Sequence, residues 1–151
     1  MVGKCLMVLA LAAAPHIVHS EFTFPLPAHY HELTLGDSRQ RVVIEAIEAR
    51  GAKPTITFQE APIAAHIVDS ASCSATAASI GAGQGTLKRA ALIAGPMGKA
   101  CQMEIVAAQG VALITELDLR TATWLMTCNF ADGDAQAEKI CRATLAAFEA
   151  K

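Results

Sequence analysis

Hydrophobic and polar residues alternate through most of the second half of the chain, which is the pattern of half-buried β-strands. In residues 101–107 the apolar side chains of Cys101, Met103 and Ile105 share one side, and polar residues take the other. Turn-forming residues such as Gly110 separate the alternating segments, and strands joined by short turns pair antiparallel. We therefore expect a four-strand meander formed by residues 86–94, 101–107, 111–119 and 121–130.

The last segment of the chain changes to the helical period. Between residues 134 and 150 apolar residues recur every three or four positions, and Asp132 or Asp134 can cap the first turn. A helix of this kind must bury its apolar stripe, and the preceding sheet offers the surface. The predicted apolar face of this C-terminal amphipathic helix contains Ala137, Ile140, Cys141, Thr144, Leu145 and Phe148.

The first half of the chain gives shorter signals. Residues 22–24 and 54–60 predict strands. Residues 38–50 have apolar positions at helical spacing and follow Asp37, which can cap a helix, so we expect a helix there. Residues 63–80 also fit a helical face, although their serines weaken the pattern.

Together these elements define a single α+β domain, an antiparallel sheet with helices packed mainly on one face. Their order is helix, strand, ambiguous helix, four strands and a final helix. This order is similar to that of the PsbP-like sandwich. The similarity is one of layout, so it implies a fold and neither a function nor a site residue.

The N-terminus has the features of a secretory signal peptide. Lys4 precedes an apolar run at residues 5–14, which is too short to span a bilayer, and Pro15 ends that run. Val18 and Ser20 are acceptable at positions −3 and −1 of a cleavage site. We therefore expect a leader that is removed after Ser20.

Cleavage there would leave residues 21–151 as one exported domain, in the periplasm or outside the cell. No second apolar run is long enough to cross a membrane. Loss of Cys5 with the leader leaves an even number of cysteines, as in many exported domains with disulfides. The alternative is that residues 1–20 form a buried element of a cytosolic domain.

The four remaining cysteines allow three pairings, and the predicted elements favour one of them. Cys128 shares a strand face with Trp124, and Cys141 lies on the apolar face of the following helix. These two cysteines can therefore bond, and Cys73 and Cys101 pair by elimination. The alternative is that one or both pairs stay reduced and pack as small apolar residues.

Charge and composition argue against several partners. The formal net charge is −2, and the chain has neither a basic cluster nor a series of aromatic residues, so nucleic acid is not an expected partner. A dinucleotide-binding loop follows a strand and precedes a helix. Gly81, Gly83 and Gly85 stand in the opposite order, after a predicted helix and before a predicted strand. We expect these glycines to connect into the strand at residue 86, and we predict no cofactor.

The paired carboxylates have ordinary explanations. Asp132 and Asp134 fit helix capping. Glu116 and Asp118 are expected on the outward, solvated face of a strand. Neither pair predicts acid–base chemistry.

His29 and His31 are the residues most suggestive of chemistry. On an extended chain, residues two apart project to the same side, so these histidines could share a metal ion. Glu32, Asp37 or His66 would have to supply a third ligand. The alternative is an exposed loop with incidental histidines.

Two functions fit this sequence. The first is a non-enzymatic exported module that binds a protein or a small-molecule ligand. The small size of the domain, its expected disulfides and the lack of a convergent set of polar residues favour it. The second is a small hydrolase or metal-dependent enzyme that uses His29, His31 or His66. The second function requires these side chains to meet in one cleft with a further carboxylate.

Overall fold

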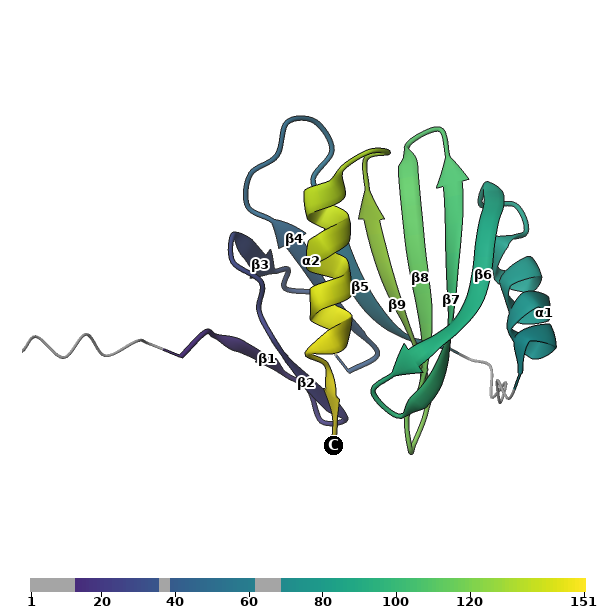
Figure 1. The fold of residues 1–151 in the computed structure, drawn as a ribbon. Helices are drawn as coiled ribbons and strands as arrows, with labels where there is room; N and C mark the ends of the chain where they lie inside the picture. The colour runs from purple at the N-terminus through teal and green to yellow at the C-terminus, as the bar shows by residue number, and fades with distance from the viewer. Residues whose placement is uncertain (1–12, 36–38, 62–68) are drawn as a thin grey trace, which may run out of the picture.

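Two antiparallel sheets form the framework of the protein. The structure, a computed structural model, describes residues 13–35, 39–61 and 69–151. A seven-stranded sheet has the order β3-β4-β5-β9-β8-β7-β6, and a small sheet has the order β1-β2-β10 (Figure 1). The strands are β1 His16–Val18, β2 Phe22–Pro25, β3 Tyr30–Glu32, β4 Arg41–Ala46, β5 Thr55–Ala61, β6 Thr86–Gly95, β7 Gly98–Ala107, β8 Gly110–Asp118, β9 Thr123–Phe130 and β10 Glu149–Ala150.

Regular alternation located the strands correctly in most of the chain. The strands predicted near residues 22, 54, 86, 101, 111 and 121 are present as β2, β5, β6, β7, β8 and β9. Consecutive strands from β6 to β9 pair antiparallel. With two helices added to these sheets, the domain is α+β, as predicted.

The two helices, α1 Ser70–Gly81 and α2 Ala135–Ala146, pack on opposite faces of the large sheet. Neighbouring β8 residues show this, because successive side chains in a strand point to opposite faces. Leu113 lies in the core with Cys141 of α2, whereas Ile114 lies in a second core with Cys73 of α1. Figure 1 shows α2 lying across the sheet and α1 beside β6. The expectation of helices mainly on one face is therefore wrong, since both faces of this half of the sheet are apolar.

Aromatic residues join the small sheet to the same face as α2. Phe24 of β2 stacks on Phe58 of β5 with ring centroids 4.6 Å apart. Phe22 meets Trp124 of β9 edge-on at 5.1 Å and stacks on Phe148 at 5.1 Å. All five rings are buried, and each such pair contributes about 0.5–1.5 kcal/mol beyond its buried area.

The helix expected at residues 38–50 is absent from residues 39–50, which instead contain strand β4, so that prediction is wrong. Val42, Val43 and Ile44 form a β-branched run, which favours extended backbone. Antiparallel pairing with β3 on one side and β5 on the other satisfies the backbone of this run. Val42, Val43 and Ile44 are all buried, so both faces of this strand are apolar. The strand therefore lacks the alternation of apolar and polar residues that would have indicated it.

The C-terminal helix is shorter than predicted. It begins after Asp134, whose carboxylate accepts a hydrogen bond from the Ala137 backbone N–H at 3.0 Å, so the predicted cap is present. It ends at Ala146, and the chain continues into β10, which pairs with β2. The exit from the helix allows Phe148 to be buried among the other rings while the last residues gain strand pairing.

Residues on the N-terminal side of the predicted cleavage point belong to the fold. β1 pairs antiparallel with β2, and Ile17 is 6% exposed. Within the described parts of the chain, the helices are too short or too polar to cross a membrane.

Candidate binding groove

A surface groove lies between α2 and the β6–β7 hairpin, and we call it the α2–β6 groove. Its volume is about 360 Å³. One wall comes from the C-terminal half of α2, and the other comes from the end of β6 and its turn. The residues that line it are Ile93, Ala94, Gly95, Pro96, Gln102, Arg142, Leu145 and Ala146.

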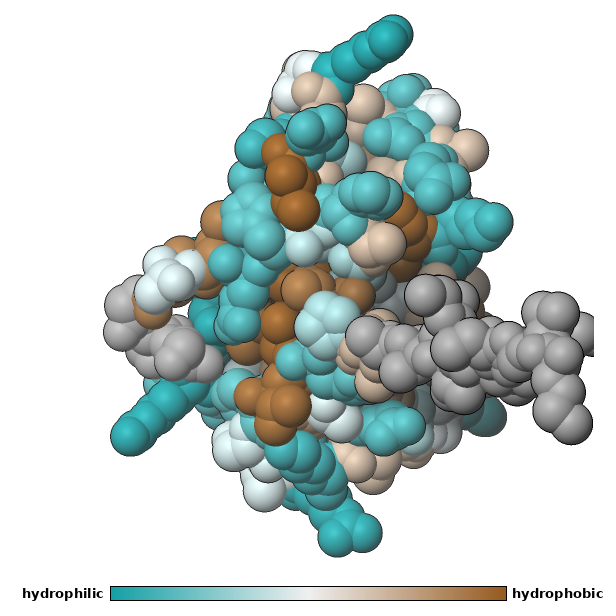
Figure 2. Space-filling view, turned by 90° about the vertical axis from the view of Figure 1, so that its left-hand side faces the viewer, coloured by the Kyte–Doolittle hydropathy of each residue, from teal (hydrophilic) through white to brown (hydrophobic). Residues whose placement is uncertain are grey.

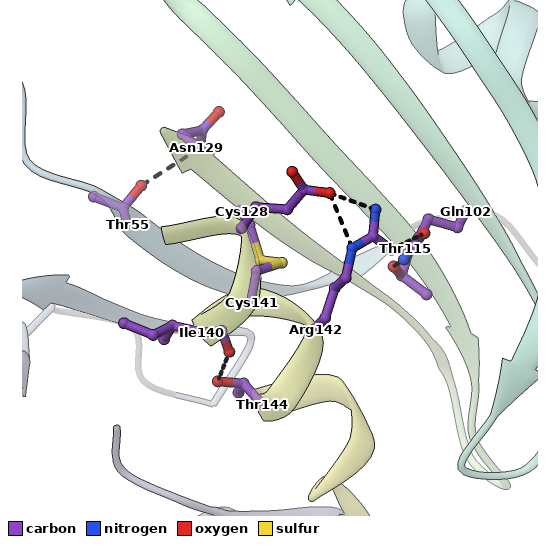
Figure 3. The surroundings of a disulfide bond; sticks show 10 residues. Thr55, Gln102, Thr115, Cys128, Asn129, Ile140, Cys141, Arg142 and Thr144 are labelled. Carbon is purple, nitrogen blue, oxygen red and sulfur yellow. Dashed lines mark hydrogen bonds and ion pairs between the residues drawn. A yellow bond between two sulfur atoms is a disulfide. The ribbon is translucent and has the colours of Figure 1, made fainter. Parts of the chain in front are cut away.

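A chain of polar side chains crosses the floor of this groove. The amide nitrogen of Gln102, a buried residue of β7, donates to the Thr115 hydroxyl of β8 at 3.1 Å. The amide oxygen of Gln102 accepts from the Arg142 guanidinium at 3.1 Å (Figure 3). A buried amide must find partners for both ends, and this arrangement provides them. Gln102 therefore holds Arg142 in place.

Arg142 is fixed from the helix side as well. Its Nε and one terminal nitrogen donate to the Glu138 carboxylate at 3.0 and 2.7 Å, one helical turn earlier. An exposed pair of this type contributes little stability. Its effect here is geometric, because three nitrogens of one guanidinium are held by two partners. The side chain is exposed at the edge of the groove but has a defined orientation.

A disulfide anchors the helix next to this arginine. Cys141 of α2 bonds to Cys128 of β9 with a sulfur–sulfur distance of 2.01 Å (Figure 3). On the other face, Cys73 of α1 bonds to Cys101 of β7 at 2.10 Å. These are the two pairs that the sequence predicts. Each bond ties one helix to one face of the sheet.

Further charges lie on the same face as the groove. Arg89 of β6 and Glu104 of β7 are 3.6 Å apart. Glu104 and Glu138 also line a small neighbouring hollow of about 50 Å³, together with Asp132 and Asp134. The surface between α2 and β6 thus carries both arginines and carboxylates.

His29 and His31, the candidate metal ligands, do not line this groove. His29 has a φ of 65°, a left-handed conformation in which histidine is enriched among non-glycine residues, and β3 begins only at Tyr30. The premise that His29 and His31 lie on one extended strand is therefore wrong. His31 pairs across strands with Glu45. His66 lies outside the described residues.

Within residues 13–35, 39–61 and 69–151, no three His, Cys, Asp or Glu side chains are grouped so as to hold a metal ion. Metal binding by His29 and His31 remains an untested prediction. Asp37, one of the expected third ligands, lies outside the described residues, as His66 does. The exposed Glu32 ends β3.

Gly83 and Gly85 connect α1 to β6, as predicted, whereas Gly81 is the last residue of α1 itself. Gly83 has a φ of 78°, and Gly85 has a φ of 156°. A Cβ on Gly85 would lie 2.5 Å from the Val106 carbonyl oxygen, so close backbone approach explains this glycine. These residues therefore serve the turn between the elements.

Glu116 is the clearest error among the predicted polar positions. The outward, solvated position expected for it is wrong, because it is 5% exposed on the α1 face of an internal strand. It lies between Cys101 and Leu125 of the neighbouring strands. Burial, with a smaller effect from Asp118, raises the pKa of the Glu116 carboxyl above its ordinary value.

The fold and the groove define a class, a disulfide-bonded α+β sandwich with an open groove beside its C-terminal helix. No protein-family model matches the chain, and no curated protein matches it. The chain is similar to the solution structure of cyanobacterial PsbP (CyanoP) from Synechocystis sp. PCC 6803. The TM-score is 0.64, with 14% identity over 99% of each chain. At this identity the likeness shows the fold, which agrees with the layout expected from the sequence.

Proposed function

We propose that this protein is an exported, non-enzymatic accessory module that binds a segment of a partner protein in the α2–β6 groove. The observation that carries the proposal is the Thr115–Gln102–Arg142 chain, which fixes one arginine beside apolar side chains at the groove. Two disulfides support an oxidising compartment, because such bonds persist mainly in exported proteins.

The groove has the chemistry of a peptide-binding surface. Ile93 and Pro96 are partly exposed apolar side chains, and Ala146 is exposed beside them. Arg142 borders this apolar strip. Arginine next to apolar surface is enriched in protein interfaces, where it donates several hydrogen bonds in a fixed geometry. We therefore propose a partner segment with an apolar anchor and a carbonyl or carboxylate acceptor that approaches Arg142.

A site-specific photo-crosslinker tests the location of binding. The crosslinking residue would replace Ala146 in the groove, and in a control it would replace the exposed Ser74 of α1 on the opposite face. We expect a discrete crosslinked species in the exporting cell from position 146 and none from position 74. Equal products from both positions, or none from position 146, would contradict binding in this groove.

Charge reversal supplies a second control. Arg142→Glu should abolish the product from position 146, because it replaces the donor with a repelling acceptor. Lys139→Glu makes the same charge change at an exposed position of α2 that does not line the groove, and it should leave the product intact.

A further inference from the structure

We infer that the leader of this protein is cleaved before Pro15, within the alanine-rich segment, so that the mature chain keeps β1. The inference rests on the proposed export, but it places the processing site elsewhere than after Ser20. Its basis is the set of contacts that residues 15–19 make with the rest of the domain.

β1 is bonded into the small sheet along its whole length. Its residues pair with β2 from His16 opposite Pro25 to Val18 opposite Thr23. The Thr23 hydroxyl donates to the Ile17 carbonyl at 2.9 Å, and the Ile17 side chain belongs to the main core. Just before the strand, the Pro15 carbonyl accepts from the Leu26 backbone N–H at 2.8 Å. Cleavage after Ser20 would remove all of these contacts.

His19 is tied to the core by its ring. The ring stacks on Phe22 with centroids 4.6 Å apart and meets Trp124 edge-on at 5.0 Å. The Glu21 backbone N–H donates to its Nδ1 at 3.2 Å, so Nε2 is the nitrogen that donates to the Arg39 carbonyl at 3.0 Å. Loss of His19 would therefore uncover part of the aromatic cluster.

The C-terminus also contacts this segment. The Lys151 ammonium group donates to the His19 carbonyl at 2.6 Å. Without β1, strand β2 would become an edge with unpaired backbone groups, a common route to association with other chains. Figure 2 shows the side of the molecule that bears β1, where hydrophobic patches already lie between hydrophilic residues. Removal of β1 would add buried residues such as Phe24 to the exposed surface of this side.

The sequence before β1 offers better cleavage sites than the one after Ser20. Signal peptidases require small residues at positions −3 and −1. Ala10 with Ala12, and Ala12 with Ala14, both have the A-x-A pattern, and residues 5–11 still provide an apolar segment of sufficient length. Pro15 directly follows Ala14, and proline lacks a backbone N–H and restricts the residue before it, which disfavours cleavage after Ala14. Cleavage after Ala12 would begin the mature chain at Ala13 and retain β1.

The test is the N-terminus of the exported protein, measured by intact mass and N-terminal sequencing. We expect Ala13 as the first residue. Ala12→Arg removes a small residue from both patterns and should abolish processing. Ser20→Arg changes an exposed residue and blocks only a cleavage after position 20, so it should leave the N-terminus unchanged.

The outcomes separate this inference from the proposed export. A first residue of Glu21, or a block of processing by Ser20→Arg, would overturn the inference and leave export intact. An unprocessed chain retained in the cytosol would overturn export itself.

A stability comparison tests the structural reason without export. Chains of residues 13–151 and 21–151 would be prepared separately, and we expect the shorter chain to have a Tm roughly 5–10 °C lower. Equal Tm values would overturn the role assigned to β1.

Discussion

Gln102 of β7 accepts a hydrogen bond from Arg142 of α2 at 3.1 Å, although the two residues are 40 positions apart in the chain. This contact links the helix that borders the groove to the sheet beneath it. Because Gln102 also donates to Thr115, one buried amide sets the position of the arginine relative to two strands. The groove is therefore a product of tertiary packing and not of a local motif.

Replacement of Gln102 tests this coupling. Gln102→Ala removes a partner from both Thr115 and Arg142, and loss of a buried hydrogen-bond partner costs about 1–3 kcal/mol. We expect the free energy of unfolding, measured by urea denaturation, to fall by that amount. Gln109→Ala in the exposed β7–β8 turn should change it little. The same loss at both positions would show that Gln102 has no special structural role.

The two disulfides should stabilise the domain similarly but affect the groove differently. They close loops with sequence separations of 13 and 28, for which the chain-entropy model gives about 3 and 3.6 kcal/mol. Urea denaturation of Cys128→Ala/Cys141→Ala and of Cys73→Ala/Cys101→Ala should therefore show losses of this order. Only the first pair holds α2, so only its removal should weaken crosslinking from position 146. Equal weakening by both variants would contradict the assignment of the groove to α2.

Local patterns predicted the parts of the fold that depend on local geometry. Strict alternation and turn residues located β6 to β9, and the position of Cys128 and Cys141 on apolar faces indicated their bond. β4 was missed because both of its faces carry buried apolar residues, so Val42 and Val43 lose the alternation that indicates a strand. The helices were placed on one face because the sequence does not reveal that α1 covers the apolar face of β7 while α2 packs on the opposite face of the sheet.

The groove residues could not be predicted in the same way. Gln102 has the alternation of a solvent-facing strand position, and its burial depends on α2 crossing the sheet above it. Glu116 was misplaced because its strand lies inside the sheet with both faces covered. A buried polar residue in an apolar strand can be recognised only when the packing on both faces is known.

Glu116 should make the stability of the protein depend on pH. Burial raises the pKa of its carboxyl in the folded state, so the folded protein holds this proton more tightly than the unfolded chain does. The contribution of Glu116 to the stability of the fold is then fully present below the ordinary pKa of a glutamate, and it is lost as the pH rises through the folded-state pKa. Glu116→Gln should therefore raise the free energy of unfolding at pH 7 relative to the unmodified protein.

The same variant should give no advantage near pH 3, where the carboxyl is protonated in both states. Urea denaturation across this pH range measures the difference, and Glu48→Gln at an exposed position provides the control. A constant difference between Glu116→Gln and the unmodified protein at all pH values would contradict the proposed role of burial.

Replacement by alanine should have very different effects on stability at two adjacent residues of β1. Ile17 is 6% exposed in the main core, whereas Val18 is 70% exposed on the outer side of the strand. In a chain that begins at residue 13, Ile17→Ala should lower the free energy of unfolding by about 2–3 kcal/mol, because it leaves a cavity beside Phe24 of the paired strand. Val18→Ala should change it by less than about 0.5 kcal/mol. If both substitutions had the same small effect, β1 would not be packed on the core, and the reason for its retention in the mature protein would be lost.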